Sequence, residues 1–444
     1  MREDQGRLLS DKTERTDVVI VGAGFTGLSA ALELKRAGID FVLLEARDRV
    51  GGRVEAVFNG LGERIDSGGQ FLCVDMPEVM ALAKAHGKTF VETYVDGEFI
   101  SHPSMTPARA ERTYYISMAI RERMNQIDPD DPAIAGLTVA AWLERQDDPA
   151  DAKAAFRSLV EGLWCLSADK VPLWYLIDND RRITNEVFEL QYFLRETMQS
   201  LAEDLAGELG DRVRLNEPVT RIEHGPEGVR VVSASGAIEV RKMLVALPPA
   251  TAAKLDFVPA LPSMLGKALS VWESGSVTKI LVRYAKPFWR ERGLCGMVMW
   301  RDLPGLFACD ASKDAEHAAL IVFIGGPLAL RWRTLGETAF RAEVTGKLVG
   351  ALGPDAGDII DFSSRDWIHD RWSGGAYSDL IVDVTARDAE HAIRAGAGPI
   401  HFASSELSPS FPGYVEGAIV MGRIAAKEIV SGLQSAMATK ASGS

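Results

Sequence analysis

The stretch that decides the fold is Asp17-Val18-Val19-Ile20-Val21-Gly22-Ala23-Gly24-Phe25-Thr26-Gly27-Leu28. Its apolar, mostly β-branched run at 18–21 predicts a parallel strand buried on both faces, and residues 25–37 predict a helix directly after it. Between them, Gly22 allows a tight turn, Gly24 lets the backbone approach a pyrophosphate, and Gly27 lets the helix lie close to the strand. The stretch therefore predicts a strand, a phosphate-binding turn and a helix.

A second strand is expected at 41–44, and it ends at Glu45. This acid lies roughly 20 residues beyond the glycines, where a carboxylate can bind the ribose hydroxyls of a dinucleotide. The glycine pattern alone is weak evidence, but with both strands, the helix and the acid it predicts a bound dinucleotide. The candidate contacts are Gly22, Gly24, Phe25, Thr26, Gly27 and Glu45.

Composition narrows the class of protein. The chain has 444 residues, 47% of them hydrophobic and 25% charged, which is typical of a globular protein with two or three domains. Its net charge of −13 argues against binding nucleic acid or an anionic membrane. No run of about 18 apolar residues predicts a membrane span, and no secretory signal is recognised in the first 14 residues. The four scattered cysteines predict reduced thiols in a cytoplasmic protein, without a disulfide framework or a metal site.

The rest of the chain alternates between helical and strand patterns. Helices are expected at 78–86, 108–127, 138–145, 150–165, 190–209 and 415–430. Strands are expected at 211–215, 217–222, 229–232, 237–240, 242–247, 277–284 and 399–402.

Glu45-Ala46-Arg47, followed by Val50-Gly51-Gly52-Arg53, resembles the second signature of the flavin-containing amine oxidases, the monoamine oxidase family. By itself this segment reads as a surface loop with a salt bridge, but beside the first motif it suggests a second phosphate contact, in which Arg53 supplies a forked cationic donor. The resemblance implies FAD as the dinucleotide, with Ala46, Arg47, Gly52 and Arg53 as contacts. Asp66-Ser67-Gly68-Gly69-Gln70-Phe71 resembles the next loop of that family, which passes the flavin ring and implies contacts from Gly69, Gln70 and Phe71.

Two later segments resemble those that carry catalytic residues in this family. The spacing from Lys279 to Pro287-Phe288-Trp289 resembles that of the family, in which the lysine holds a water against flavin N5. Burial at that position would lower the pKa of Lys279. Residues 366–377 resemble the penultimate motif, which implies that Trp367 lies beside Lys279 and that Tyr377 forms one wall of an aromatic cage. Ala376 stands where mammalian monoamine oxidases carry the cysteine that bonds to the flavin, so the FAD is expected to be non-covalent.

The last motif runs through Phe402-Ala403-Ser404-Ser405-Glu406 and then Gly413-Tyr414-Val415-Glu416-Gly417-Ala418. The family has glycine and threonine at the positions of Ser404 and Ser405, while Glu406 and Tyr414 match. The resemblance makes Ser405, Glu406 and Val415 FAD contacts and Tyr414 the second cage wall. The following helix N-terminus favours a developing negative charge on the flavin.

Two residues have roles that the sequence leaves open. Val219 corresponds to a valine that offers its backbone to the adenine in the family, but ordinary strand packing explains it equally well. Trp164 is either a core residue or part of the substrate cavity.

The expected fold class is α/β, α+β overall, as in the amine oxidase type of flavoprotein: a Rossmann-like FAD-binding domain with an interleaved substrate domain of mixed sheet and helices. The FAD-binding domain is expected at 15–79, 196–262 and 395–433, the substrate-binding domain at 80–195 and 263–394, and flexible termini at 1–14 and 434–444.

The resemblance implies a flavin-dependent amine oxidase. A hydride equivalent would pass from the amine α-carbon to flavin N5, the imine would be hydrolysed, and O2 or a protein acceptor would remove the electrons, with H2O2 formed from O2. A neutral amine between Tyr377 and Tyr414 would need no counter-charge. Oxidases of nicotine-type cyclic or secondary amines, of polyamines and of L-amino acids stay open. For the last, Arg109, Arg112, Arg181 and Arg182 are candidates to bind a carboxylate. A carbon–carbon desaturase and a non-catalytic FAD protein are disfavoured, and a homodimer is left open.

Overall fold

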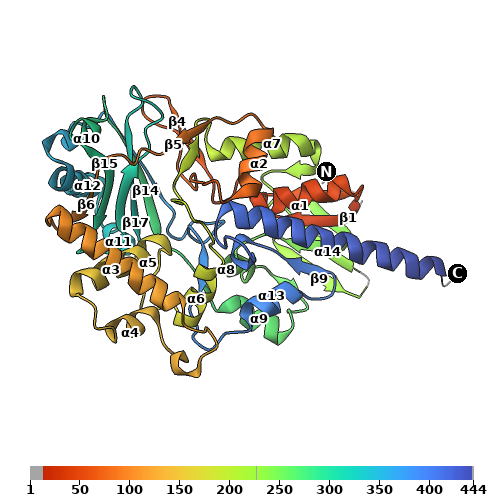
Figure 1. Ribbon diagram of the computed structural model, residues 1–444. Coiled ribbons are helices and arrows are strands. Elements are labelled where there is room, and N and C mark those ends of the chain that lie inside the picture. The colour runs from red at the N-terminus through yellow and green to blue at the C-terminus, as the bar shows by residue number, and fades with distance from the viewer. Residues whose placement is uncertain (1–13, 227, 443–444) are drawn as a thin grey trace, which may run out of the picture.

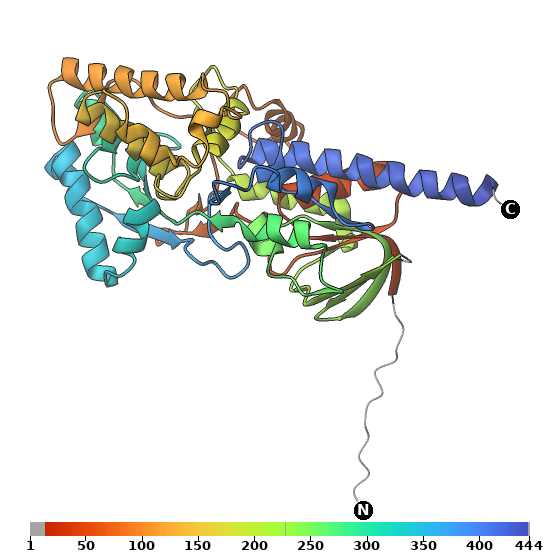
Figure 2. The ribbon, with the colours of Figure 1, turned by 90° about the horizontal axis from the view of Figure 1, so that it is seen from below.

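The computed structural model describes residues 14–226 and 228–442. Of the termini expected to be flexible, residues 1–13 and 443–444 lie outside the described residues. The chain forms two halves that lie side by side, each built on one large β-sheet (Figure 1). The long C-terminal helix α14 (Val415–Ser442) lies against helix α1 (Phe25–Arg36), and its last turns project beyond the rest of the molecule (Figures 1 and 2).

The first half is built on a sheet with the order β12-β9-β10-β11-β1-β2-β8, in which β20 also pairs with β11. Its strands are β1 (Glu14–Val21), β2 (Phe41–Leu44), β8 (Val213–Arg214), β9 (Arg221–Gly225), β10 (Gly228–Ser233), β11 (Gly236–Val245), β12 (Phe257–Val258) and β20 (Ile400–Phe402). β1 runs parallel to both β2 and β11, and Val18, Val19 and Ile20 are fully buried. The β-branched run thus forms the central buried strand that the sequence predicts.

The second half is built on a sheet with the order β18-β14-β17-β16-β15-β6. Its strands are β6 (Glu98–His102), β14 (Val277–Arg283), β15 (Leu294–Trp300), β16 (Leu306–Asp310), β17 (Ala319–Gly325) and β18 (Asp361–Asp366). All seven residues of β14 are buried, because β17 and β18 pair with it on both sides and other segments of the chain pack on both faces of the sheet there. Helices α3 (Pro107–Asn125) and α5 (Ala150–Leu163) pack together beside this sheet (Figure 1).

The remaining elements connect the two halves and cover their edges. The helices are α2 (Pro77–Ala85), α4 (Val139–Glu144), α6 (Leu173–Arg181), α7 (Met198–Leu209), α8 (Pro249–Ala252), α9 (Ser263–Ser270), α10 (Phe288–Glu291), α11 (Gly326–Trp332), α12 (Glu337–Leu352) and α13 (Ala389–Ala395). The short strands are β3 (Ala56–Phe58), β4 (Arg64–Asp66), β5 (Phe90–Glu92), β7 (Tyr192–Leu194), β13 (Trp272–Ser274) and β19 (Asp379–Ile381).

Five expected elements differ from the structure. The helix expected at 190–209 begins only at Met198, because residues 192–194 form β7 against β5 and Thr197 has a φ of +80°, which no helix tolerates. The strand expected at 217–222 begins at Arg221. The strands expected at 237–240 and 242–247 are one strand, β11, and the C-terminal helix continues to Ser442.

The strands divide between the halves by sequence segment. The first sheet takes its strands from residues 14–44, 213–258 and 400–402, and the second takes them from residues 98–102 and 277–366. This supports the expected interleaving of two domains, and their precise boundaries stay a prediction. Within the described part of the chain, no helix is long and apolar enough to cross a membrane, and no group of three or more metal-binding side chains occurs.

Candidate active site

A cavity of about 1990 Å³ runs between the two halves of the molecule. It is larger than the roughly 300–1,000 Å³ typical of a site for one small ligand, so it can hold an extended cofactor together with a substrate. Every predicted site residue lines it except Gly27 and Glu406. The residues that do so are Gly22, Gly24, Phe25, Thr26, Glu45, Ala46, Arg47, Gly52, Arg53, Gly69, Gln70, Phe71, Trp164, Val219, Lys279, Trp367, Tyr377, Ser405, Tyr414 and Val415.

The three glycines of the first motif have different surroundings. A Cβ on Gly22, whose φ is +102°, would lie 2.7 Å from the carbonyl oxygen of Ala246. A Cβ on Gly27 would lie 1.9 Å from the carbonyl oxygen of Gly22, so a side chain there would push helix α1 away from the turn. A Cβ on Gly24 would meet nothing within 4 Å, although Gly24 lines the cavity. Gly22 and Gly27 therefore serve the fold, and Gly24 leaves space for a ligand at the start of α1, as a pyrophosphate requires.

Glu45 follows β2 and is only 5% exposed. One carboxylate oxygen accepts a hydrogen bond from the backbone N–H of Ala23 at 2.8 Å, and the other accepts one from the N–H of Arg47 at 2.9 Å. These bonds fix the carboxylate at the cavity wall, and each oxygen keeps lone pairs that ribose hydroxyls can use. Val219, whose role the sequence left open, lines the same cavity and is half-buried.

Two hydroxyl groups on the cavity wall have no hydrogen-bond partner in the described residues. Ser404 Oγ and Thr251 Oγ1 are both buried, and both residues line the cavity. A buried polar group without a partner is costly, so these hydroxyls fit a cavity that holds a polar ligand. Together with the open space at Gly24 and the fixed Glu45, they are compatible with a dinucleotide such as FAD.

Arg53, predicted to contact phosphate, is largely engaged by other protein groups. Its two Nη atoms donate to Glu406 at 2.5 and 3.2 Å, to Tyr377 O at 2.8 Å and to Ser405 Oγ at 3.1 Å, which leaves Nε. Glu406 is fully buried. Burial alone would raise the pKa of Glu406, but Arg53 lowers it to about 2. The pair thus joins the Gly-Gly-Arg loop to the C-terminal motif, and Glu406 holds Arg53 without reaching the cavity wall.

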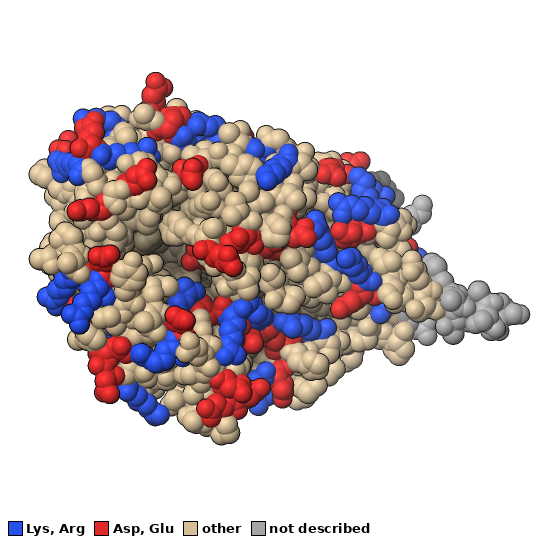
Figure 3. Space-filling view, viewed as in Figure 1, with Lys and Arg blue, Asp and Glu red and all other residues tan. Residues whose placement is uncertain are grey.

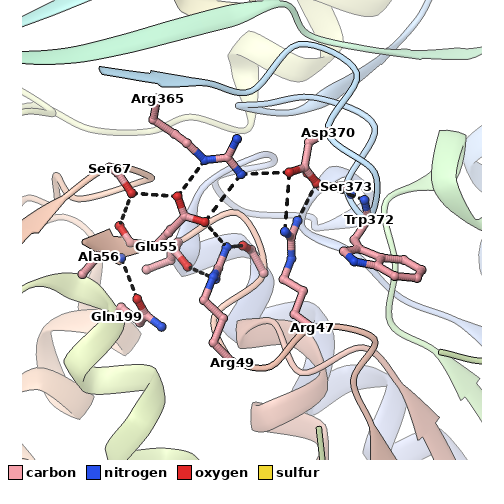
Figure 4. Close-up of polar contacts among 12 residues, drawn as sticks. Arg47, Arg49, Glu55, Ala56, Ser67, Gln199, Arg365, Asp370, Trp372 and Ser373 are labelled. Carbon is pink, nitrogen blue, oxygen red and sulfur yellow. Dashed lines mark hydrogen bonds and ion pairs between the residues drawn. The ribbon is translucent and has the colours of Figure 1, made fainter. Parts of the chain in front are cut away.

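A second ion network joins the two halves beside the site (Figure 4). Glu55 accepts from Arg49 at 2.6 Å and from Arg365 at 2.7 Å, and Asp370 bridges Arg365 and Arg47 at 2.8 and 2.6 Å. The Arg365 guanidinium also lies 4.2 Å from the ring centroid of Trp367. The network therefore holds the end of β18, which Trp367 directly follows, against the loop that follows β2.

Lys279 lies in the middle of β14 and is 3% exposed. Its Nζ donates to Gly68 O at 2.6 Å and to Gln70 Oε1 at 2.5 Å, while Trp367 Nε1 donates to Ser67 O at 2.9 Å. Both side chains thus contact the loop whose sequence resembles the flavin-passing loop. Burial lowers the pKa of Lys279 to about 8, although the negative charge of Asp66 opposes this.

The two tyrosines of the expected cage each pack on a phenylalanine ring. The Tyr377 ring lies edge to face with Phe323, with centroids 5.8 Å apart, and Tyr414 packs in the same way on Phe411 at 5.9 Å. Burial raises the pKa of both tyrosines, so the phenols are neutral at pH 7. Trp164 is 5% exposed and lines the cavity as well as the core.

The sequence analysis missed one residue of this region, Glu189. The phenol of Tyr414 donates a hydrogen bond to Glu189 Oε2, so a carboxylate lies beside the expected cage. Glu189 stands alone between Phe188 and Leu190, outside every motif and outside regular secondary structure, and no sequence signal singled it out.

The four arginines considered as carboxylate ligands all lie away from the cavity wall. Arg109 pairs with Asp151 at 2.9 Å, Arg182 pairs with Glu390 at 2.8 Å, and Arg181 donates to the backbone oxygens of residues 125 and 127. Arg112 is exposed on α3. The arginine that lines the part of the cavity formed by residues 97–190 is Arg121. Its two hydrogen bonds to Asp180, at 2.8 and 2.5 Å, use the same edge of the guanidinium.

Comparison with known proteins identifies the group to which the chain belongs. The model of the flavin-containing amine oxidoreductase family matches residues 25–112 and 137–430. The chain is 25% identical to an L-amino acid dehydrogenase of Synechocystis sp., over 93% of this chain and 94% of that protein. It is 29% identical to the flavin-containing amine oxidase B of Cavia porcellus, over 94% of this chain and 87% of that protein. A solved structure of putrescine oxidase bound to putrescine matches with a TM-score of 0.86 and 25% identity, over 94% of this chain and all of that one. The chain belongs to the flavin-containing amine oxidoreductase family, whose members are enzymes that act on amines.

Proposed function

We propose that the protein is an oxidase that converts the carbon–nitrogen single bond of a small amine into an imine, which water then hydrolyses. Bound FAD would supply the chemistry that the side chains lack, namely acceptance of a hydride from the amine α-carbon and transfer of the two electrons to O2, which would give H2O2. The observation that carries the proposal is that Lys279, Tyr377 and Tyr414, from three distant parts of the chain, line one cavity that begins at the glycine turn.

The residues of the first half would hold the cofactor. Gly24 leaves room for the pyrophosphate at the start of α1, and Glu45 offers its carboxylate oxygens to the ribose. The hydroxyls of Ser404 and Thr251 would gain the partners that they lack. Ala376, which is 3% exposed, has no nucleophile to form a covalent bond, so we propose that the FAD is held non-covalently.

Lys279 and the two tyrosines would place the substrate. The phenol rings of Tyr377 and Tyr414 would accept the amine between their faces, and their apolar surroundings favour the neutral amine, whose lone pair is needed for the oxidation. Lys279 uses two of its three N–H donors on Gly68 and Gln70, and its third is free to hold a water molecule. The side chains thus supply position, orientation and a dry surrounding.

The same geometry favours amines over amino acids. The Synechocystis relative is named an L-amino acid dehydrogenase and the solved neighbour a putrescine oxidase, so the family name does not decide between them. In the part of the cavity formed by residues 97–190, the one cation that could bind a substrate carboxylate is Arg121, which is already paired bidentately with the buried Asp180. Glu189 would repel such a carboxylate.

The test is turnover of the FAD-loaded protein by a panel of primary, secondary and cyclic amines, together with the L-amino acids that carry the same side chains. We expect H2O2 and an aldehyde or ketone from amines, and at least about tenfold lower kcat/KM for the carboxylated analogues. Turnover of amino acids alone would contradict the proposed substrate class. If the product forms without H2O2 when an artificial acceptor is added, O2 is not the electron acceptor. The proposed oxidation of amines would still hold.

A further inference from the structure

The part of the cavity formed by residues 97–190 is strongly acidic. All residues of this segment are described, and those that line the cavity include six acids and one cation, Arg121. The acids are Glu98, Glu111, Glu122, Asp180, Glu186 and Glu189. Figure 3 shows a hollow in this face of the molecule with acidic side chains at its rim. Because Arg121 is paired with Asp180, the lining keeps an excess of negative charge, which favours cations over anions.

Glu189 is the acid that lies against the expected cage. It is half-buried, and its Oε2 accepts the hydrogen bond from the Tyr414 phenol. No lysine, arginine or histidine among residues 14–226 and 228–442 forms a salt bridge with it. Neighbouring Arg121 attracts it electrostatically but gives its hydrogen bonds to Asp180. A half-buried carboxylate with one neutral partner is incompletely compensated, and a positively charged ligand would complete it.

The position of Glu189 separates it from the nitrogen that reacts. That nitrogen must be neutral, and a carboxylate in direct contact with it would stabilise its protonated form, which has no lone pair. Glu189 lies instead at the hydroxyl edge of the Tyr414 ring, away from the ring face on which the reacting amine is expected. An ammonium bound by Glu189 therefore belongs to another nitrogen of the same substrate.

We propose that Glu189 binds a second, protonated amino group of the substrate, so that the enzyme selects diamines over monoamines of the same chain length. This inference rests on the proposed function. It adds a specificity-determining residue outside the motifs that identify the family, and it explains why an acid without a salt bridge lies against the Tyr414 phenol. Glu98, Glu111 and Glu122 would attract the same cationic substrates toward the cavity.

The experiment compares kcat/KM for two matched pairs, 1,4-diaminobutane with 1-butylamine and 1,6-diaminohexane with 1-hexylamine. For at least one pair, we expect the wild-type enzyme to prefer the diamine by about 10- to 100-fold, as for other charge-assisted hydrogen bonds. Glu189→Gln should remove most of this preference by slowing the diamine, with the monoamine changed by less than about threefold. Glu189→Asp, which keeps the charge, should retain part of the preference.

Two further variants test whether the charge acts from this position. Glu186→Gln removes one negative charge from an exposed part of the cavity wall and should leave the diamine-to-monoamine ratio within about twofold of wild type. Tyr414→Phe removes the hydrogen bond to Glu189 but keeps the carboxylate, so the ratio should persist even where both rates fall.

The outcomes separate this inference from the proposed function. A wild-type enzyme that oxidises the monoamine as efficiently as the diamine in both pairs would overturn the role of Glu189 but not amine oxidation. An equal loss for both substrates in Glu189→Gln would also overturn it, because the residue would then act through Tyr414. A wild-type enzyme that oxidises neither amine of either pair would overturn the selection of diamines, and inactivity on the whole panel of primary, secondary and cyclic amines would overturn the proposed function itself.

Discussion

Alanine substitutions at two glycines of the first motif, Gly24 and Gly27, are expected to impair the protein for different reasons. Gly24 has φ −74° and ψ 177°, which alanine adopts easily, and its Cβ would meet no protein atom within 4 Å. Gly24→Ala should therefore change the unfolding free energy of the cofactor-free protein by about 1 kcal/mol or less, which is the cost of a poorer helix N-cap. Its methyl group would instead occupy space in the cavity where the pyrophosphate approaches, and we expect FAD to bind at least about tenfold more weakly, a loss of about 1.4 kcal/mol.

Gly27→Ala would place its Cβ 1.9 Å from the Gly22 carbonyl oxygen, where real contacts are at least 3.0 Å, so the backbone must move by more than 1 Å. Such overpacking typically costs about 1–3 kcal/mol and occasionally more. We therefore expect the cofactor-free Gly27→Ala protein to unfold at a clearly lower temperature than wild type, which Gly24→Ala should not do.

The assay is thermal unfolding of the cofactor-free proteins, with and without FAD, beside a titration of flavin fluorescence. FAD at 100 times its dissociation constant should stabilise the wild type by about 2.7 kcal/mol, and Gly24→Ala should lose at least half of this gain at the same FAD concentration. Wild-type FAD affinity in Gly24→Ala, or a loss of stability as large as that of Gly27→Ala, would refute the assignment of the glycines.

Three more predictions follow from the site. Lys279→Met should retain FAD but slow one half-reaction of the flavin by about 100-fold. The stopped-flow pH profile of the wild type should show an inflection near pH 8, where Lys279 loses its proton as the pH rises, and this inflection should vanish in the variant. An unchanged profile would show that Lys279 takes no part in the reaction. Acid precipitation of the yellow protein should leave the flavin in the supernatant, and colour in the pellet would contradict non-covalent binding. Burial alone would raise the pKa of Glu55, but the bonds from Arg365 and Arg49 have the larger effect, and the pKa is lowered. The ionised Glu55 therefore stabilises the folded protein, and this contribution should be lost as the pH falls below about 4. Glu55→Gln should therefore lower the unfolding free energy at pH 7 by about 1–2 kcal/mol, with a smaller difference at pH 4, and equal losses at both values would show that the charge is not what stabilises.

Local patterns were sufficient to predict the elements that position the cofactor. The buried run at 18–21 and the spacing from Gly22 to Glu45 depend on neighbours close in sequence, and the structure has β1, α1 and β2 where the sequence predicts them. The family resemblance added the residues that motifs carry, and Lys279, Trp367, Tyr377 and Tyr414 all line one cavity. Their roles in the reaction stay predictions until the variants are measured.

The features that the sequence did not predict depend on contacts between distant segments. The partner of Arg53 is Glu406, which is 353 positions away. No local pattern shows that these two residues form an ion pair with each other. Residues 192–194 look helical in sequence but form a strand because β5 pairs with them. Glu189 is notable only because it contacts Tyr414, which lies 225 positions later in the sequence. The negative charge at the cage could therefore be recognised only from the structure.

The central claim is that this cavity brings an amine to a bound flavin in a position to be oxidised. Its most direct measurement is anaerobic mixing of the FAD-loaded protein with an amine, because a single reduction needs neither O2 nor any other acceptor. The account predicts that the visible absorbance of the oxidised flavin disappears, at a rate that saturates with amine concentration and falls severely in the Tyr377→Ala and Tyr414→Ala variants. Absorbance that persists in the wild-type protein with every amine of the panel would contradict it.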